Sequence, residues 1–338
     1  MSFYPKNILV TGGAGFIGSH YIHDALRAYN DIHIVNLDKL TYAGSLKRLE
    51  NLPYPNRYTF IQGDILNRAL VEKILCEHNI DTIVHFAAES HVDRSIANPS
   101  IFIETNIMGT FTLLDAAKKY WLDEKKFSQH QCRFHHISTD EVYGSLREND
   151  PPFTETSRYS PNSPYSASKA ASDHWVRAYH ETYQLPVTIS NCSNNYGPMQ
   201  AEEKFIPTVI AACFEKRSIP IYGKGFNIRD WIYVKDHCKM VEWIIRHGKI
   251  GDTYNVGGNN ELRNIDLAKK ICKIIDELQP ECAPSEKLLT YVTDRLGHDW
   301  RYAISNEKIE RESGMIVSDK AAFLNQLRET VESTSKIF

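Results

Sequence analysis

Two short segments of the chain carry residue types that could transfer a hydride and remove water. Asp140 and Glu141 place two carboxyl groups side by side after a strand-like run, and Tyr165 and Lys169 follow four residues apart. Residues four apart share one face of a helix, where an ammonium group can lower the pKa of a phenol. Tyr165 is therefore a candidate base at neutral pH.

Adjacent carboxyl groups suit an elimination, which needs one group to remove a proton and another to protonate the departing hydroxyl. Two like charges in a low-dielectric pocket push their pKa values apart, so one carboxyl can be ionised beside a protonated neighbour. Taken alone, both features have plainer explanations. A Tyr-x-x-x-Lys spacing is common on surface helices, and the carboxyl pair could lie in a solvated loop.

The amino-terminal segment has the pattern of a dinucleotide-binding turn. The apolar run Ile8–Val10 leads into glycines at positions 12, 15 and 18, and an apolar-periodic stretch continues to about Ala28. Such glycines bring the backbone close to a pyrophosphate, which the helix N-terminus then faces. Asp38 follows the next apolar run, about 20 residues beyond the last glycine, where a carboxylate binds an adenosine ribose and repels a 2′-phosphate. We expect NAD, not NADP.

Strand-like and helix-like runs alternate through the first half of the chain. This alternation predicts an α/β fold, a Rossmann-type doubly wound parallel sheet with helices on both faces. Ligands bind such sheets beyond the carboxyl ends of the strands. Five candidate residues each follow a predicted strand and are expected to line one crevice: Gly12, Asp38, Asp64, Ala87 and Thr139.

Beyond Val187–Asn191 the pattern changes to loops punctuated by proline and glycine. We assign residues 1–190 to an NAD-binding domain and residues 191–338 mainly to a smaller α/β substrate-binding domain. The run Trp231–His247 and the strand-like residues after it read as strand, helix, strand. Residues of about 231–257 are therefore expected to rejoin the main sheet, so that the two domains interleave at the C-terminal end.

Composition excludes several classes of protein. The chain has 338 residues with 42% hydrophobic content, and its net charge of −3 gives no electrostatic footprint for nucleic acid or an anionic membrane. Apolar runs fall short of the roughly 20 residues of a membrane span, and no secretory segment opens the chain, so we expect a cytoplasmic protein. Seven scattered cysteines predict no disulfide framework. The histidines at 130, 135 and 136 adjoin a strand, and we predict no metal site.

The chain resembles the extended short-chain dehydrogenase/reductase superfamily and, within it, the dTDP-glucose 4,6-dehydratases. The resemblance runs from about Lys6 to about Ile304. The glycine-rich turn and the Tyr165/Lys169 pair are shared across the superfamily. The pieces specific to the dehydratases are Thr139–Gly144, Asn191–Pro198, Asn227–Trp231 and Asp294–His298.

The resemblance implies an NAD-dependent hydro-lyase. Tyr165 would take the proton of the sugar's 4-hydroxyl while NAD accepts the C4 hydride, with Lys169 and Thr139 in support. Glu141 would then remove the C5 proton, Asp140 would protonate the departing 6-hydroxyl, and the hydride would return to C6. NAD would stay tightly bound and be recycled. The product would be dTDP-4-keto-6-deoxyglucose, an intermediate of deoxysugar biosynthesis such as the dTDP-rhamnose pathway.

The resemblance also implies which residues hold each ligand, and it implies a homodimer paired through helices around Phe102–Lys118 and Ser168–Tyr183. For NAD these residues are Gly12, Gly15, Phe16, Ile17, Gly18, Asp38, Lys39, Thr41, Asp64, Ile65, Phe86, Ala87, Ala88, Ser90, Thr105, Tyr165, Lys169 and Asn195. For the nucleotide-diphosphate sugar they are Ser90, Thr139, Asn194, Lys204, Phe205, Pro220, Tyr222, Arg229, Asn264, Arg295 and His298. Arginine and lysine suit a diphosphate because their donors meet anionic oxygens.

The sequence departs from the family pattern in two loops and in the segment between Gly144 and Tyr165, which is short, so any lid in that region is reduced. The segment Met199–Pro207 differs from the family's spacing, and Leu296 stands where the family has a proline. A flexible residue in place of proline predicts altered loop order near the nucleotide, with the chemistry kept.

Other functions share most of these residues. A UDP-glucose 4,6-dehydratase would act on a nucleotide sugar whose base lacks one methyl group. A UDP-sugar decarboxylase or 4-epimerase shares Tyr165, Lys169 and the C4 oxidation, although Asp140 argues for dehydration. A non-catalytic NAD-binding regulator could use the same fold, because fold alone does not establish chemistry.

Overall fold

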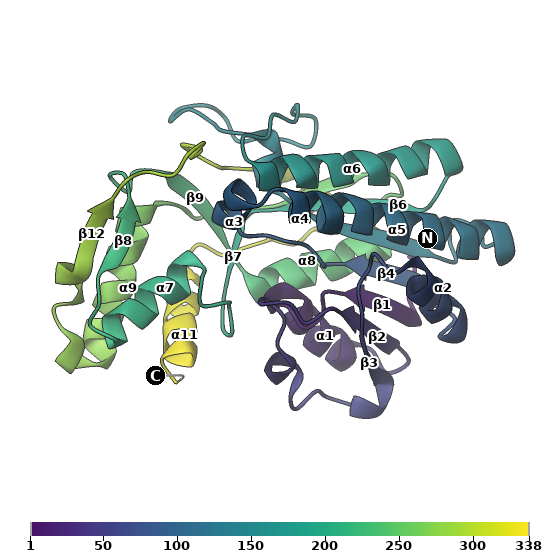
Figure 1. Ribbon diagram of the computed structural model, residues 1–338, viewed down its shortest axis with the longest axis horizontal. Coiled ribbons are helices and arrows are strands. Elements are labelled where there is room, and N and C mark those ends of the chain that lie inside the picture. The colour runs from purple at the N-terminus through teal and green to yellow at the C-terminus, as the bar shows by residue number, and fades with distance from the viewer. Residues whose placement is uncertain (1, 337–338) are drawn as a thin grey trace.

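The computed structural model describes residues 2–336, and its largest sheet has seven parallel strands in the order β10-β6-β5-β4-β1-β2-β3 (Figure 1). These strands are β1 Asn7–Thr11, β2 His33–Asp38, β3 Tyr58–Gln62, β4 Thr82–His85, β5 Arg133–Thr139, β6 Val187–Cys192 and β10 Thr253–Val256. The strand order reverses between β1 and β4, and ligands bind doubly wound sheets at such a switch point. The expected Rossmann-type sheet is therefore confirmed.

Helices cover both faces of this sheet, which explains why its strands are apolar on both sides. Helices α1 (Phe16–Ala28) and α8 (Val234–His247) pack together on one face, where Ile22 and Val241 share a core with Val10. The opposite face carries the larger core, to which all three of its helices contribute. These helices are α2 Arg68–Glu77, α5 Gly109–Ala117 and α6 Pro164–Tyr183.

Helix α6 begins where local signals place its start. Ser163 and Ser166 form a reciprocal capping box, and Pro164 occupies the first helical position. Tyr165 therefore lies in the first turn, at the end of the helix nearest the carboxyl ends of the strands. Beside α6, a helical segment is wound as a π-helix over Ile103–Met108, between α4 (Ser100–Phe102) and α5. π-Helical turns are frequent at functional sites.

A smaller unit lies beyond the edge of the main sheet (Figure 1). It contains a three-stranded sheet, a two-stranded sheet and three helices around a separate apolar core. The sheets consist of β7 Asn194–Tyr196, β9 Ile228–Tyr233 and β11 Glu261–Arg263, and of β8 Ile219–Tyr222 and β12 Leu289–Val292. The helices are α7 Phe205–Phe214, α9 Asn264–Leu278 and α11 Phe323–Ser335.

The two units interleave, but the chain returns to the main sheet later than expected. Helix α8 and strand β10 do join the main sheet, whereas β9, expected there from Trp231 onward, pairs with β7 and β11. The reason is that β10 already occupies the edge of β6. Between β12 and α11 of the small unit, α10 (Glu307–Ser313) packs beside β10, and Ile309 joins a core with residues of α8.

None of the helices within residues 2–336 is long and apolar enough to span a membrane. In the same residues, no group of three or more histidine, cysteine, aspartate or glutamate side chains could hold a metal ion. The seven cysteines of this region are free thiols.

Candidate active site

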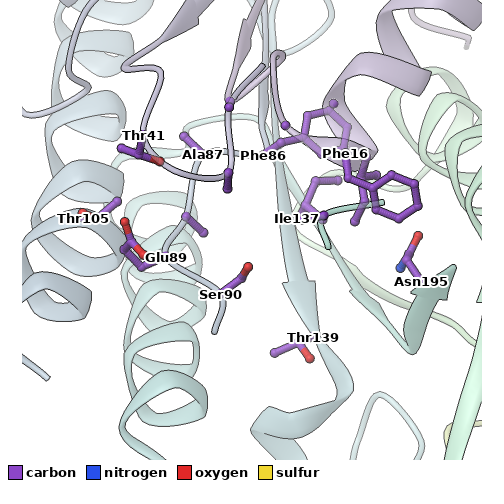
Figure 2. A pocket seen from close by; sticks show the side chains of 18 of the residues that line it. Phe16, Thr41, Phe86, Ala87, Glu89, Ser90, Thr105, Ile137, Thr139 and Asn195 are labelled. Carbon is purple, nitrogen blue, oxygen red and sulfur yellow. The ribbon is translucent and has the colours of Figure 1, made fainter. Parts of the chain in front are cut away.

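A cavity of about 350 Å³ lies along the carboxyl ends of the main-sheet strands. Its lining includes every residue that the sequence assigned to NAD, from the glycine turn after β1 to Asn195 in β7. Figure 2 shows Thr41, Glu89 and Thr105 on one side of the cavity, Phe16 on the other, and Thr139 at the end of β5.

The glycine turn has no room for side chains. Gly12 has a φ of +72°, and a Cβ there would lie 2.6 Å from the backbone nitrogen of Ala87. A Cβ on Gly18 would lie 2.6 Å from the carbonyl oxygen of Gly12. Helix α1 starts at this turn without a side-chain cap, and its first residues, Phe16 and Ile17, line the cavity. The turn therefore presents free N–H groups and bare backbone, which fits a pyrophosphate.

Asp38 ends β2 with its carboxylate fixed by backbone donors. Oδ2 accepts a hydrogen bond from the N–H of Ala14 at 2.9 Å, and Oδ1 accepts one from Leu40 at 2.8 Å. Beside it, Lys39 Nζ lies 2.7 Å from Asp64 Oδ2. A fixed carboxylate at this place can accept ribose hydroxyls and disfavours a 2′-phosphate, so the residues present fit NAD.

Tyr165 and Lys169 both line the cavity, but the pKa of Tyr165 moves in the direction opposite to expectation. Burial raises the pKa of Tyr165 well above its ordinary value, nearby Glu141 adds to the rise, and a hydrogen bond with Thr139 opposes it. Lys169 directs its ammonium to the carbonyl oxygen of Ile137, at 2.8 Å. Burial lowers the pKa of Lys169 to about 8. The expected lowering of the phenol pKa was wrong, because burial and the nearby Glu141 carboxylate raise the pKa.

The adjacent carboxyl groups differ in their surroundings. Asp140 is 1% exposed and lies outside the cavity lining. Its Oδ1 accepts a long hydrogen bond, 3.4 Å, from Thr139 Oγ1. Its Oδ2 has no hydrogen-bond partner within residues 2–336. Burial raises the pKa of Asp140 well above its ordinary value, with further contributions from Glu141 and Asp230.

Glu141 lines the cavity and has cations around it. Burial also raises the pKa of Glu141, but the positive charges of Arg229, Lys204 and Arg295 act against this rise. The two pKa values are therefore separated in the direction an elimination needs, with Asp140 holding its proton more strongly than Glu141.

The residues assigned to the sugar nucleotide fall into two groups. Ser90, Thr139, Asn194, Lys204 and Phe205 line the cavity. Lys204 Nζ donates to the carbonyl oxygen of Ser90 at 2.9 Å, which joins the small unit to the loop after β4.

The second group lies outside the cavity lining and consists of Pro220, Tyr222, Arg229, Asn264, Arg295 and His298. Arg229 is buried, donates from Nη2 to the carbonyl oxygen of Asp299 at 3.0 Å and stacks 4.3 Å from the ring centre of Tyr302. Its charge affects the pKa values of both Asp140 and Glu141, which indicates proximity to the carboxyl pair. Pro220 and Tyr222 lie on β8, and Asn264 begins α9.

Arg295 already has an anionic partner. Its Nε and Nη2 lie 2.7 and 3.0 Å from the two carboxylate oxygens of Asp93, in the short helix α3 (Val92–Ala97). Arg295 also lies 5.1 Å above the ring of Tyr222, whose edge meets His298. A diphosphate that binds Arg295 must therefore replace the Asp93 carboxylate or share the guanidinium with it.

Sequence reasoning missed several lining residues, of which six are polar or aromatic: Glu89, Ser138, Ser193, Gln200, Glu203 and Trp231. Glu89 is 6% exposed and accepts a hydrogen bond from the Tyr42 hydroxyl at 3.1 Å. Its position two residues after Ala87 was an available signal. Trp231 ends a segment that the family resemblance had singled out, but only its arginine was assigned a role.

Comparisons with known proteins agree with this geometry. Residues 9–318 match the family model described as GDP-mannose 4,6 dehydratase. The chain is 50% identical to the dTDP-glucose 4,6-dehydratase of Salmonella typhimurium over 333 residues, 96% of this chain and 91% of that protein.

Two solved structures extend the comparison. The dTDP-glucose 4,6-dehydratase DesIV from Streptomyces venezuelae, solved with NAD bound, is 42% identical with a TM-score of 0.88 over 98% of this chain and 97% of that one. UDP-glucose 4-epimerase from Thermotoga maritima, 26% identical, has a TM-score of 0.84 over 98% and 99%. The family resemblance drawn from sequence motifs is confirmed, and the chain belongs to the 4,6-dehydratase family that the model describes.

Proposed function

We propose that this chain is a dTDP-glucose 4,6-dehydratase, an NAD-dependent hydro-lyase that forms dTDP-4-keto-6-deoxyglucose and water. The observation that carries the proposal is the carboxyl pair Asp140–Glu141, which follows β5 beside a cavity that also holds Tyr165 and Lys169. The names of the relatives that are about half identical to the chain support the same substrate.

The glycine turn, the N-terminus of α1 and Asp38 would hold the dinucleotide. Bound NAD supplies a hydride acceptor at the first step and a hydride donor at the last, so none is consumed. The Tyr165 phenol takes the proton of the 4-hydroxyl as C4 is oxidised. Since burial raises its pKa, Tyr165 needs nearby positive charge to act as a base, and Lys169, one helical turn away, supplies it.

The elimination uses the carboxyl pair. A ketone at C4 acidifies the C5 proton, which Glu141 removes as the C6–oxygen bond breaks and a C5–C6 double bond forms. Asp140 gives its proton to the departing hydroxyl, which leaves as water. Burial raises the pKa of both carboxyl groups, but cations oppose the rise at Glu141, whereas Glu141 and Asp230 add to it at Asp140, so Asp140 is the group suited to be the acid and Glu141 the group suited to be the base.

The first test is mass spectrometry of purified protein incubated with dTDP-glucose or with UDP-glucose and no added NAD. We expect the loss of one water from dTDP-glucose, because the recycled cofactor remains bound. A stronger reaction with UDP-glucose would give a UDP-glucose 4,6-dehydratase. An unchanged mass with both substrates, in protein shown to contain NAD, would refute dehydration and favour an epimerase, whose fold this chain shares.

We also propose that the protein is a homodimer. The π-helix after α4 and helix α6 leave several large apolar side chains exposed, and these two elements lie side by side. Ile103 is 53% exposed, and Met108, Trp175 and Tyr183 are each more than 40% exposed. Light scattering of wild type and of Trp175→Glu tests this, because a charged residue in the interface should yield monomers, and a wild-type monomer would refute it.

Two further proposals concern the location of the enzyme in the cell and the pathway that it serves. A cytoplasmic location is supported by the absence of a disulfide among the cysteines of residues 2–336. Fractionation of cells with an antibody against the protein would check the location. The product class suits deoxysugar synthesis, the dTDP-rhamnose pathway included, and loss of that sugar after deletion of the coding sequence would assign the pathway.

A further inference from the structure

Asp173 is a buried carboxylate that the proposed mechanism does not use. It lies on α6 one turn after Lys169 and is 2% exposed. Its Oδ2 accepts hydrogen bonds from Ser138 Oγ at 2.8 Å and Tyr159 Oη at 3.0 Å, and Asn191 Nδ2 lies 3.5 Å away. These donors come from β5, from the loop before α6 and from β6, so the carboxylate joins three parts of the main domain.

The ring of His136 lies between the other carboxylate oxygen of Asp173 and the ammonium group of Lys169. Oδ1 of Asp173 makes no hydrogen bond within residues 2–336 and lies 3.3 Å from Nε2 of His136. The same Nε2 lies 3.3 Å from Nζ of Lys169. Burial lowers the pKa of His136 well below its ordinary value, so the ring is neutral at physiological pH. A neutral ring can accept from the ammonium or donate to the carboxylate.

We propose that Asp173 is a positioning residue for the oxidation at C4, because its carboxylate, with His136, keeps Lys169 charged and oriented below Tyr165. The inference rests on the proposed function, since it assigns Asp173 to the step that Tyr165 and Lys169 perform. Asp173 is not among the residues that line the cavity, so it acts through the lysine.

The electrostatics of the cluster agree with the contacts. Burial lowers the pKa of Lys169 to about 8, and Asp173 is the foremost group that opposes this lowering. Reciprocally, burial raises the pKa of Asp173 to about 6, and Lys169 is the foremost group that opposes the rise. Each group therefore keeps its charge near neutral pH partly because the other is charged, as buried ions require.

The remaining titratable groups around this pair are neutral near pH 7. Burial lowers the pKa of His85, whose ring centre lies 5.2 Å from that of His136. Burial raises the pKa of the Cys192 thiol to about 12 and raises those of Tyr143 and Tyr159 above their ordinary values. No other side chain of this cluster, among the residues described, can replace the Asp173 charge.

The test is the pH dependence of the first turnover, followed as NADH absorbance after rapid mixing of the holoenzyme with dTDP-glucose. In wild type, oxidation should decline as pH rises through about 8 and Lys169 loses its proton. In Asp173→Asn this alkaline limb should move to lower pH by about one unit, the scale of a nearby opposite charge. Oxidation should then fall about twofold at pH 7 and about tenfold at pH 9, with KM for dTDP-glucose unchanged.

Tyr159→Phe is the matched control, because it removes a hydrogen bond to the same carboxylate and leaves the charge in place. Its alkaline limb should stay at the wild-type position. An unmoved limb in Asp173→Asn, or the same movement in Tyr159→Phe, would show that Asp173 is only structural. If Asp173→Asn fails to fold, Asp173→Ser removes the same charge with a smaller side chain and should move the limb to lower pH, and an unmoved limb there overturns the inference.

Failure of the proposed function and failure of the role of Asp173 give different experimental results. A wild-type protein that forms no NADH with dTDP-glucose refutes the proposed function and this inference with it. An active wild type whose pH profile is unaffected by Asp173→Asn refutes the inference alone.

Discussion

Replacing Asp140 by asparagine should separate the oxidation from the elimination. Asp140 is buried, and its raised pKa keeps it neutral, so Asp140→Asn changes no charge in the site. The amide has the same shape and lacks only the acidic proton. We expect oxidation at C4 to form NADH in the wild-type protein and in the variant at rates within about threefold of each other. In the variant, the loss of water should then be slow.

The size of the effect follows from what the carboxyl contacts. Oδ1 makes one long contact, at 3.4 Å, and Oδ2 makes no hydrogen bond among the described residues. The substitution should therefore cost less than about 1 kcal/mol of folding stability, the value of one ordinary hydrogen bond. Loss of a general acid should slow the elimination by roughly 10²–10⁴-fold, about 3–5 kcal/mol of barrier.

The assay follows NADH absorbance and the mass of the sugar nucleotide in the same single turnover. Glu141→Gln is the comparison, because it should form NADH but stop exchange of the C5 proton with deuterated water. In Asp140→Asn the exchange should continue while water loss is slow. If Asp140→Asn loses water at the wild-type rate, Asp140 is not the acid. If NADH formation slows in the variant as much as water loss does, Asp140 acts in an earlier step.

Three further results are expected. Burial raises the pKa of Glu141, so the base form of Glu141 is lost as the pH falls through its pKa. Exchange of the C5 proton, measured by mass spectrometry, should therefore decline on acidification. A flat profile down to about pH 5 would contradict this. Gly12→Ala and Gly314→Ala should each lose about 1–2 kcal/mol in thermal unfolding, because φ is +72° and +69° at these positions. Only Gly12→Ala should also lose most of its bound NAD, because its Cβ would lie 2.6 Å from the Ala87 backbone, whereas no atom lies within 4 Å of the new Cβ at Gly314. Asp93→Asn should tighten dTDP binding about threefold or more in calorimetry by releasing Arg295, and weaker binding would show that the ion pair organises the site.

Residues at the ends of strands were the part of the site that the sequence could predict. Gly12, Asp38 and Thr139 each follow an apolar run, and parallel strands bring such positions to one edge whatever lies between them. Tyr165 was found because it stands four residues before Lys169, a spacing that places both side chains on one face of a helix. For these residues, short stretches of sequence contain the physical cause of their position.

The remaining features depend on contacts between distant segments. The apolar pattern of β9 predicts a strand, but its partners are decided by competition for the edge of β6. The pairing of Arg295 with Asp93 joins residues 202 positions apart. The pKa of Tyr165 depends on how deeply the folded chain buries the phenol, which helical spacing cannot reveal. Such features follow from the complete fold, and local patterns do not contain them.

The interleaved path of the chain limits how this enzyme can be re-engineered. Strand β10 completes the edge of the main sheet although it lies in sequence between two parts of the small unit, and α8 packs against α1. A chimera that joins residues 1–190 to another enzyme's carboxyl-terminal half would therefore receive a foreign edge strand and a foreign helix beneath the cofactor site. A transplant intended to change only nucleotide preference should keep Val234–Val256 from the recipient and exchange the flanking segments as two separate inserts.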